Sequence, residues 1–458
     1  MNPSTSAEKL ARLADFRQLF YDRILLRAAD ALFELLDAVL TTRAITCFAE
    51  LSLAPVFRRG WPSLYEALDD GVIDTKAMLP MLVGQMQQQR GQDDSRVVLV
   101  LDHSSYPRVQ SYTLAERGFH HAATGVPGNR PITIGYSYST VGWIAHADRQ
   151  NDGPPARRDS WCLPLLEERI LPASTPITAG AEQLKRVLTT IADAPRPLLL
   201  ADSEYASASF LRATAELPCD MLMRLRPNRV LYAAPPEYSG RGRRPKHGAK
   251  FVLKDPTTWP DALEHDRVAT TDGRSIRLRR WSGLHMREAA TVVVDLILVE
   301  RCDADGAVSA YMWLIYLGEP TLGLAQMSQL YLRRFGVEHW YRFAKQRLHW
   351  TLPRVSTPER IDSWTALTLL GQWQLYLARD VVIDTPLPWQ KPLASPTPGR
   401  VAEGFAGVIA RIGTPAVAPK PRGKSPGWTT GRVRQARAQH PITRKTSRTD
   451  APAVKPPP

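Results

Sequence analysis

The sequence predicts an α/β protein with a helical region before its core and a basic tail after it. Two short, fully apolar runs, 97–101 (VVLVL) and 198–200 (LLL), are typical of buried strands. Around them, apolar residues recur at the three- and four-residue spacing of amphipathic helices. Strands that alternate with helices in this way favour an α/β core.

Residues 1–90 are predicted to form a helical N-terminal domain. Leu10, Leu13 and Phe16 begin the periodic pattern. The leucine-rich stretch 24–40 is interrupted by four charged residues and therefore predicts an amphipathic helix, not a membrane span. Scattered arginines are compatible with DNA binding, but no clear helix-turn-helix pattern is present. A DNA-binding role and a purely structural role are equally open here.

Residues 91–226 are predicted to form the first part of the core, and residues 291–385 the second part. In the first part we expect strands at 97–101, 132–144, 198–200 and 221–225 and a helix at 180–192. In the second part we expect strands at 292–299 and 311–317 and two long helices, 322–350 and 359–378.

Residues 227–290 are predicted to be a basic, partly β insertion that splits this core. It contains a glycine-punctuated loop with Arg241, Arg243, Arg244 and Lys246, followed by an arginine-rich strand at 276–281. The cations of the loop could follow a DNA backbone, or the loop could be an ordinary solvated one. The residue pattern favours neither reading.

The last segment, 386–458, is predicted to be a mostly disordered basic tail. From 413 to 458 it has ten Lys or Arg residues, many prolines and one acid, Asp450. The whole chain has a formal net charge of +14. Each cation that neutralises a phosphate releases a counterion, so a surplus of this size favours a nucleic-acid partner.

The cysteines and the N-terminus indicate the compartment. The four cysteines are far apart and include no CxxC pair, which argues against a zinc site and a disulfide framework. No basic segment followed by an apolar one, as in a secretory signal, is evident at the N-terminus. We therefore expect a cytoplasmic protein with no membrane partner.

Two aspartates follow buried runs. Asp102 comes directly after 97–101, and Asp202 comes after 198–201. A carboxylate at the carboxyl end of a central strand projects from a rigid platform, where ligands of α/β folds bind. Taken alone, each is more often a turn or cap residue.

A stripe of four polar residues strengthens the functional interpretation. Tyr331, Arg334, Glu338 and Lys345 stand at offsets of 3, 7 and 14 residues. At about 100° per residue they fall within roughly a 60° arc of one helix. Glu338 would complete a metal-binding cluster with the two aspartates, while Arg334 and Lys345 would grip phosphates. The alternative is a solvated helix face with mixed charges.

This stripe resembles the YREK signature of DDE transposases of bacterial insertion sequences, in the insertion-sequence-four superfamily. The resemblance covers about residues 95–350. It implies an RNase H-like mixed-sheet catalytic core that a β-rich insertion interrupts between the second Asp and the Glu. The order is similar here, since Asp202 follows Asp102 by 100 residues and Glu338 follows Asp202 by 136.

The resemblance also implies roles for these residues. Asp102, Asp202 and Glu338 would be catalytic and would bind two Mg²⁺ ions, or Mn²⁺, because hard divalent ions prefer oxygen ligands. The substrate would be double-stranded DNA, cut at transposon terminal inverted repeats and joined to target DNA. Tyr331, Arg334, Lys345 and the basic loop would contact DNA. A homodimer on DNA and association with the bacterial nucleoid are further implications.

Several alternatives remain beside this reading. The chain could be an inactive or domesticated DNA-binding protein derived from a transposase, or an RNase H-like nuclease unrelated to transposition. Glu204 is a second candidate carboxylate close to Asp202, and His103 and His339 are expected beside the metal site without coordinating it. The pattern predicts core packing for four tryptophans, against the stacking of one of them on an extruded base: Trp340, Trp350, Trp364 and Trp373.

Overall fold

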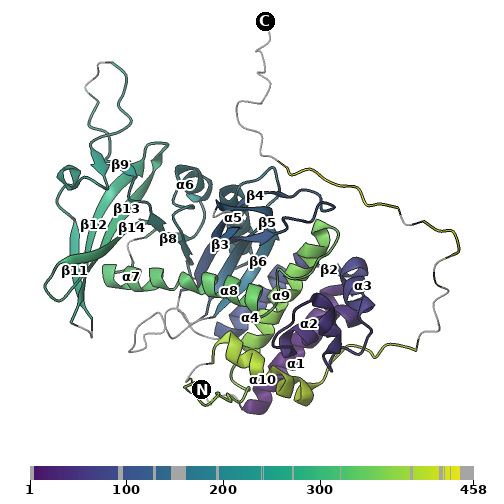
Figure 1. Ribbon diagram of the computed structural model, residues 1–458. Helices are drawn as coiled ribbons and strands as arrows, with labels where there is room; N and C mark the ends of the chain where they lie inside the picture. Colours follow the sequence, from purple (N-terminus) through teal and green to yellow (C-terminus); the bar gives the residue numbers. More distant parts are fainter. Residues whose placement is uncertain are drawn as a thin grey trace, which may run out of the picture.

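The computed structural model describes residues 5–90, 96–126, 130–145, 161–191, 195–238, 240, 242–270, 273–319, 321–391, 393, 396–421, 427, 429–433 and 435–443. Its centre is a mixed sheet of 12 strands, and helices cover the sheet and fill the N-terminal side (Figure 1). The predicted α/β class is confirmed. The mixed sheet is consistent with an RNase H-like core.

The middle of the sheet holds the strands that position the site. They are β3 (Val98–Pro107), β4 (Gly118–Val126), β5 (Arg130–Ile144), β6 (Cys162–Arg169), β7 (Leu198–Ala201) and β8 (Asp220–Leu225). β7 runs parallel to both β3 and β8, whereas β5 is antiparallel to β3, β4 and β6. Two helices, α5 (Pro176–Thr190) and α6 (Ala208–Thr214), provide the connections that parallel strands need.

The strands between residues 230 and 317, which include the predicted insertion 227–290 and the first strands of the predicted second core part, continue the same sheet on one side. They are β9 (Val230–Tyr232), β10 (Lys250–Val252), β11 (Glu264–Ala269), β12 (Ser275–Met286), β13 (Ala289–Cys302) and β14 (Val308–Leu317), with a short 3₁₀ turn, η3, at Pro256–Thr258. β14 pairs with β8 of the core and with β13. The insertion is therefore joined to the core through backbone hydrogen bonds.

The N-terminal helices and the last two helices share one core. They are α1 (Ser6–Arg23), α2 (Ala29–Thr41), α3 (Pro62–Asp70), α4 (Thr75–Arg90), α9 (Pro358–Ala378) and α10 (Pro398–Ile412), accompanied by the 3₁₀ turn η1 (Phe48–Leu53) and the strand pair β1 (Leu25–Arg27) and β2 (Val72–Ile73). Buried Arg17 of α1 donates to Asp37 of α2 (2.7 Å) and to Gln374 of α9 (2.5 Å). None of the helices in the described part of the chain is long and apolar enough to cross a lipid bilayer.

One helix was predicted over 322–350, and this prediction is wrong at its middle. The structure has two helices, α7 (Leu324–Leu332) and α8 (Phe335–Gln346). At the junction, Arg334 N–H donates to the Tyr331 carbonyl and Val337 N–H to the Arg334 carbonyl, both at 3.1 Å. These i→i−3 bonds are those of a 3₁₀ turn. The side chains of α8 therefore point in other directions, relative to those of α7, than they would on one continuous α-helix. The helix predicted at 359–378 is confirmed as α9.

The expectation of an irregular tail from residue 386 is wrong for 398–412, which form α10. The helix buries one face against α2 and α9, with Val401, Phe405 and Val408 inside. Beyond it, the chain is held again at Ala416 and Val417, whose carbonyls accept from Arg58 and Arg59. Helical periodicity in 398–412 is masked at the sequence level by the prolines and cations that surround it.

Candidate active site

Asp102 lies inside β3 and not after its end. The sequence predicted a strand that stops at Leu101, but β3 continues to Pro107 and pairs with β5 throughout. Only the pairing with β7 stops at Leu101, opposite Ala201. Asp102 therefore stands at the point where its neighbouring strand β7 ends, which opens space beside its side chain.

Asp202 follows β7 directly, as the sequence predicted. Its Oδ1 accepts a hydrogen bond from the backbone N–H of Glu204 (2.9 Å), which holds the carboxylate in a turn after the strand. Because β3 and β7 are parallel and Leu101 is in register with Ala201, Asp102 and Asp202 occupy equivalent positions on adjacent strands.

Glu338 lies in the first turn of α8, which crosses the sheet at β3. The hydroxyl of Tyr341 donates to the Asp102 carbonyl (3.1 Å) and to Thr140 Oγ1 of β5 (2.9 Å). This buried tyrosine fixes the helix on the strand that carries Asp102. The fold thus brings together three acids that are separated by 100 and 136 residues in the sequence.

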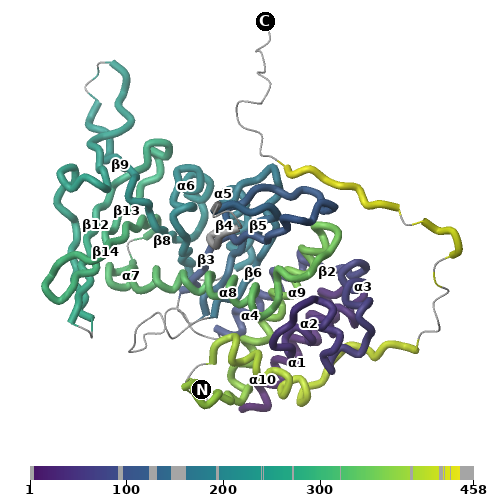
Figure 2. The backbone as a smooth tube through the Cα atoms, viewed as in Figure 1, coloured from purple at the N-terminus to yellow at the C-terminus, as the bar shows by residue number. Residues whose placement is uncertain are grey.

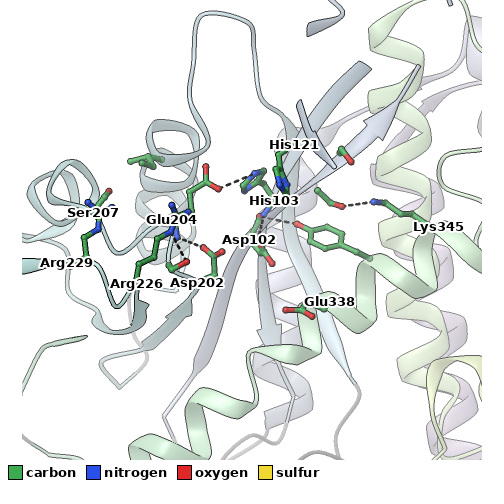
Figure 3. Close-up of a pocket in the computed structure, with 15 residues that line it drawn as sticks. Asp102, His103, His121, Asp202, Glu204, Ser207, Arg226, Arg229, Glu338 and Lys345 are labelled. Carbon is green, nitrogen blue, oxygen red and sulfur yellow. Dashed lines mark hydrogen bonds and ion pairs between the residues drawn. The ribbon is translucent and has the colours of Figure 1, made fainter. Parts of the chain in front are cut away.

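One open cavity of about 840 Å³ collects the three carboxylates (Figure 3). It lies at the edge of the sheet where β7 and β8 end. Its lining includes polar and charged side chains from β3, from the turns after β7 and β8, and from α8, namely Asp102, His103, Ser104, Ser105, Asp202, Ser203, Glu204, Arg226, Arg229, Glu338, Tyr341 and Lys345. A cavity so open and polar suits a large charged substrate.

The negative charges in this cavity act on each other. The pKa of Asp102 is raised from its ordinary value of 3.8 to about 7, first by burial and then by the charge of Asp202, with a smaller effect of Glu338. The guanidinium of Arg334 and the N–H of His103 oppose this rise. Asp102 is therefore a carboxylate that needs more positive charge nearby than the side chains provide.

Arg334 is the cation that lies between the acids. Its Nη2 donates to Glu338 Oε1 (2.6 Å), and its Nη1 is 3.5 Å from Asp102 Oδ2. The sequence predicted that Arg334 grips phosphates, whereas the structure shows it paired with two carboxylates and buried. Burial raises the pKa of the neighbouring Tyr331 to about 12, with a smaller contribution from the charge of Asp202, while the charge of Arg334 opposes the rise.

The donor set fits a hard divalent cation, although no three-ligand site is preformed. Within the described ranges, no group of three or more His, Cys, Asp or Glu side chains is arranged to hold a metal ion. Asp102 and Glu338 nevertheless converge on one positive group, the Arg334 guanidinium. Carboxylate oxygens are the ligands that Mg²⁺ and Mn²⁺ prefer. Binding between these two acids would require Glu338 to exchange Arg334 for the ion.

Positive side chains flank the acids on both sides. Lys345 donates from Nζ to Ser104 Oγ (2.8 Å) on one side, and Arg226 and Arg229 line the cavity on the other (Figure 3). Sequence reasoning missed the two arginines. The signal was present, because Arg226 directly follows β8, a strand parallel to β7, and parallel strands end at the same edge of a sheet.

Other predicted contacts lie away from the cavity. Tyr331 is buried beneath Arg334 and does not line the cavity. Arg243, Arg244 and Lys246 are exposed in the loop between β9 and β10, which projects from the far end of the sheet (Figure 1), and Arg241 lies outside the described residues.

Of the two histidines next to the candidate acids in the sequence, one lines the cavity and the other does not. His103 lines the cavity with its Nε2 3.8 Å from Glu204 Oε2, and His339 does not line it. The predicted core packing of the four tryptophans is confirmed, since each of them is at most 1% exposed: Trp340, Trp350, Trp364 and Trp373.

Comparison with known proteins adds a family. Residues 20–287 match the model of a family described as "DDE superfamily endonuclease". The matched range spans more than half of the 458 residues and includes Asp102 and Asp202, while Glu338 lies beyond it. A search of curated proteins found no match.

Proposed function

This chain belongs to the family of DDE superfamily endonucleases, and on that premise we propose that it is a DDE transposase of the cut-and-paste type. Family membership makes it a nuclease-type enzyme and implies DNA as its substrate. The observation that carries the finer proposal is the single cavity lined by Asp102, Asp202 and Glu338. In this proposal the chain is an insertion-sequence-four relative whose stripe 331–345 is its YREK signature.

The three acids would hold divalent metal ions, with Mg²⁺ favoured over Mn²⁺. When bound, such ions activate a water molecule and offset the charge that develops on the leaving oxygen of a phosphodiester. Asp102 and Asp202, adjacent on parallel strands, would form the rigid side of the site. Glu338, paired with Arg334 and partly exposed, would form the adjustable side.

The flanking cations would position the DNA strand. Lys345 on one side and Arg226 and Arg229 on the other could each donate to a phosphate next to the scissile bond. Arg334, once released from Glu338, would become available to the phosphate at the centre. Tyr331, packed beneath Arg334, would support this arginine and not the DNA itself.

The proposal also includes the biological substrate, the oligomeric state and the location of the protein. The DNA would be the terminal inverted repeats of a transposon and then a target site, with the protein acting as a homodimer assembled on DNA and associated with the nucleoid of a bacterium. The exposed cations Arg243, Arg244 and Lys246, with Arg241, would contact DNA away from the scissile bond. An inactive, DNA-binding derivative is the alternative, but a complete acid set in one cavity does not favour it.

Cleavage assays on a DNA duplex that carries the ends of the element would test this function. We expect nicking that requires Mg²⁺ or Mn²⁺ and is followed by strand transfer into a second DNA. Asp102→Asn, Asp202→Asn and Glu338→Gln should each lower the rate by at least about a thousandfold, because each removes a ligand charge at the reacting phosphate. Glu204→Gln, which changes a fourth carboxylate in the same cavity, is the matched control and should retain most activity. Cleavage without strand transfer would reduce the proposal to a nuclease.

A further inference from the structure

The C-terminal arm returns to the catalytic part of the molecule. After α10 it is anchored at Val417, whose N–H donates to Asp30 (2.7 Å), and its residues 440–443 lie at the edge of the sheet at β4 (Figure 2). β4 is the last strand in the hydrogen-bonded order of the sheet. Edge strands offer unpaired backbone groups to which a passing segment can bind.

Three hydrogen bonds hold the arm there. The N–H of His440 donates to the Tyr112 carbonyl (2.8 Å), and the N–H of Thr443 donates to the Arg117 carbonyl (2.7 Å). In return, the Nη2 of Arg117 donates to the His440 carbonyl (3.2 Å). A parallel bridge pairs Thr443 with Gly118 at the start of β4.

The surface that binds the arm contains Arg117, whose side chain is held in place by the surrounding backbone. Arg117 is 1% exposed, and its other donors are bound to the carbonyls of Arg108, Val109 and Leu114. It is therefore a buried arginine that presents one Nη group to the arm. A guanidinium fixed in this way loses little conformational freedom when it binds, which favours a defined docking position.

The docking position is next to the catalytic cavity. Thr443 lines a second cavity, of about 360 Å³, whose wall includes His103, His121 and Glu204. The same three residues line the cavity of the carboxylates. Thr443 therefore marks a rim that is continuous with the candidate active site.

The sequence that follows Thr443 is basic. Arg444, Lys445, Arg448 and Lys455 come within twelve residues of it, against one acid, Asp450. Since consecutive Cα atoms are about 3.8 Å apart, a docked Thr443 tethers these cations to the rim of the cavity. If the arm were anchored only at Val417, the chain between the anchor and these cations would be 26 residues longer than it is with Thr443 docked.

From this geometry we propose that residues 440–443 are a docking segment that holds the last fifteen residues as a DNA-binding arm beside the active site. The arm would grip the duplex that leads away from the scissile phosphate, through its phosphates and without reading sequence. The inference rests on the proposed function, because it takes DNA as the partner.

A pair of substitutions at one position tests the docking. Thr443→Pro removes the N–H that donates to Arg117, and Thr443→Val keeps it. Hydrogen exchange is measured on the full chain without DNA. The His440 amide should be protected in Thr443→Val and should exchange rapidly in Thr443→Pro. Equal protection in both variants would overturn the docking.

Binding to a short DNA duplex, measured by fluorescence anisotropy without divalent ions, tests the arm. Thr443→Pro should bind roughly tenfold more weakly than Thr443→Val, because effective concentration falls about as the −3/2 power of tether length. The double change Arg444→Gln with Lys445→Gln should lower the slope of log K against log salt by about 2, since each phosphate contact contributes about 0.9. The matched double change Arg432→Gln with Arg437→Gln, in the stretch before the dock, should lower it by less than half as much.

Equal affinities of the two Thr443 variants, or equal slopes of the two double variants, would contradict the arm. These readouts need no catalysis. If the wild-type chain fails to cut DNA while the arm variants change affinity as stated, only the transposase proposal fails. If it cuts DNA and the variants bind alike, only the arm fails.

Discussion

Arg334 and Glu338 form a 2.6 Å ion pair across the first turn of α8, and the same guanidinium reaches Asp102 on β3 at 3.5 Å. One arginine thus joins the helix to the strand through two of the candidate catalytic acids. The guanidinium is the positive charge that pairs with two of the three carboxylates, and Arg334 is therefore directed to the acids and not to solvent.

Arg334→Ala should therefore destabilise the metal-free protein. Loss of the guanidinium leaves Asp102 and Glu338 unpaired, which we expect to cost about 1–3 kcal/mol of unfolding free energy, less than for a fully buried pair because Glu338 is partly exposed. Mg²⁺ should restore more stability to this variant than to the wild type. Thermal unfolding with and without Mg²⁺ measures both effects.

The control for Arg334 is Arg342→Ala, which removes an exposed arginine from the same helix. It should change the melting temperature little and leave the response to Mg²⁺ as in the wild type. If Arg334→Ala behaves like this control, the guanidinium does not substitute for a cation at the site.

Lys345 is expected to contact a phosphate of the bound DNA. Its Nζ donates a hydrogen bond to Ser104 Oγ, and both residues line the cavity. Burial lowers the pKa of Lys345 from the ordinary 10.5. Lys345→Gln should weaken DNA binding about equally for all sequences and lower the salt slope by about 1. Lys185→Gln, an exposed change on α5, is the control. An unchanged slope in Lys345→Gln would place this lysine outside the DNA interface.

Gly180 allows α5 to approach the strands that carry the aspartates. A Cβ at this position would lie 2.9 Å from the side chain of Leu101 and 2.9 Å from that of Tyr205. In the sequence, Leu101 directly precedes Asp102, and Tyr205 follows Asp202 by three residues. Gly180→Ala should lower the unfolding free energy by about 1–3 kcal/mol through overpacking, and should also lower cleavage activity. Chemical denaturation and the DNA-nicking assay measure the two effects.

The control for Gly180 is Gly84→Ala, inside α4, where a Cβ meets nothing within 4 Å. Here alanine should stabilise the protein by up to about 1 kcal/mol, because its helix propensity exceeds that of glycine. A stabilising effect of both substitutions would mean that α5 can move away from the sheet without cost.

Glu167 on β6 predicts a pH dependence of stability. Burial raises its pKa from 4.5 to about 8, while Trp340 donates to its Oε2 (3.2 Å). Between these values the folded state keeps a proton that the unfolded state has released, so stability should fall as pH rises from about 4.5 to about 8. Glu167→Gln removes this loss, so its stability relative to the wild type should be higher at pH 9 than at pH 5.

Glu168→Gln is the matched control for Glu167, since it changes the adjacent, partly exposed acid that pairs with Arg186. It should cost less than about 1 kcal/mol, without the same dependence on pH. Denaturation curves at several pH values would decide, and a parallel response of both variants would argue that Glu167 is ionised in the folded protein.

Local sequence patterns were sufficient for several parts of this protein. The apolar run before Asp202 predicted β7 and placed the carboxylate at the strand end, and Glu338 was correctly placed on a helix. These features depend on short-range preferences, such as the apolar composition of a strand buried on both faces. The four tryptophans are buried, as expected of large, mainly apolar side chains.

Other features depend on partners that are distant in sequence. β3 extends past Asp102 because β5 pairs with it along its whole length, although its second half is polar. The pairing of Arg334 with Asp102 requires α8 to cross β3, and Arg226 reaches the cavity because β8 is parallel to β7. The arm at Thr443 binds an edge strand more than 300 residues away.

The sequence alone therefore determined the strand that ends before Asp202 and the helical placement of Glu338, because these properties are set by neighbours within a few residues. The tertiary structure alone decided where β3 ends, what Arg334 neutralises and which cations surround the acids. Those relationships arise from strand pairing and helix packing across long stretches of chain, and a one-dimensional pattern does not contain the contact partners of a residue.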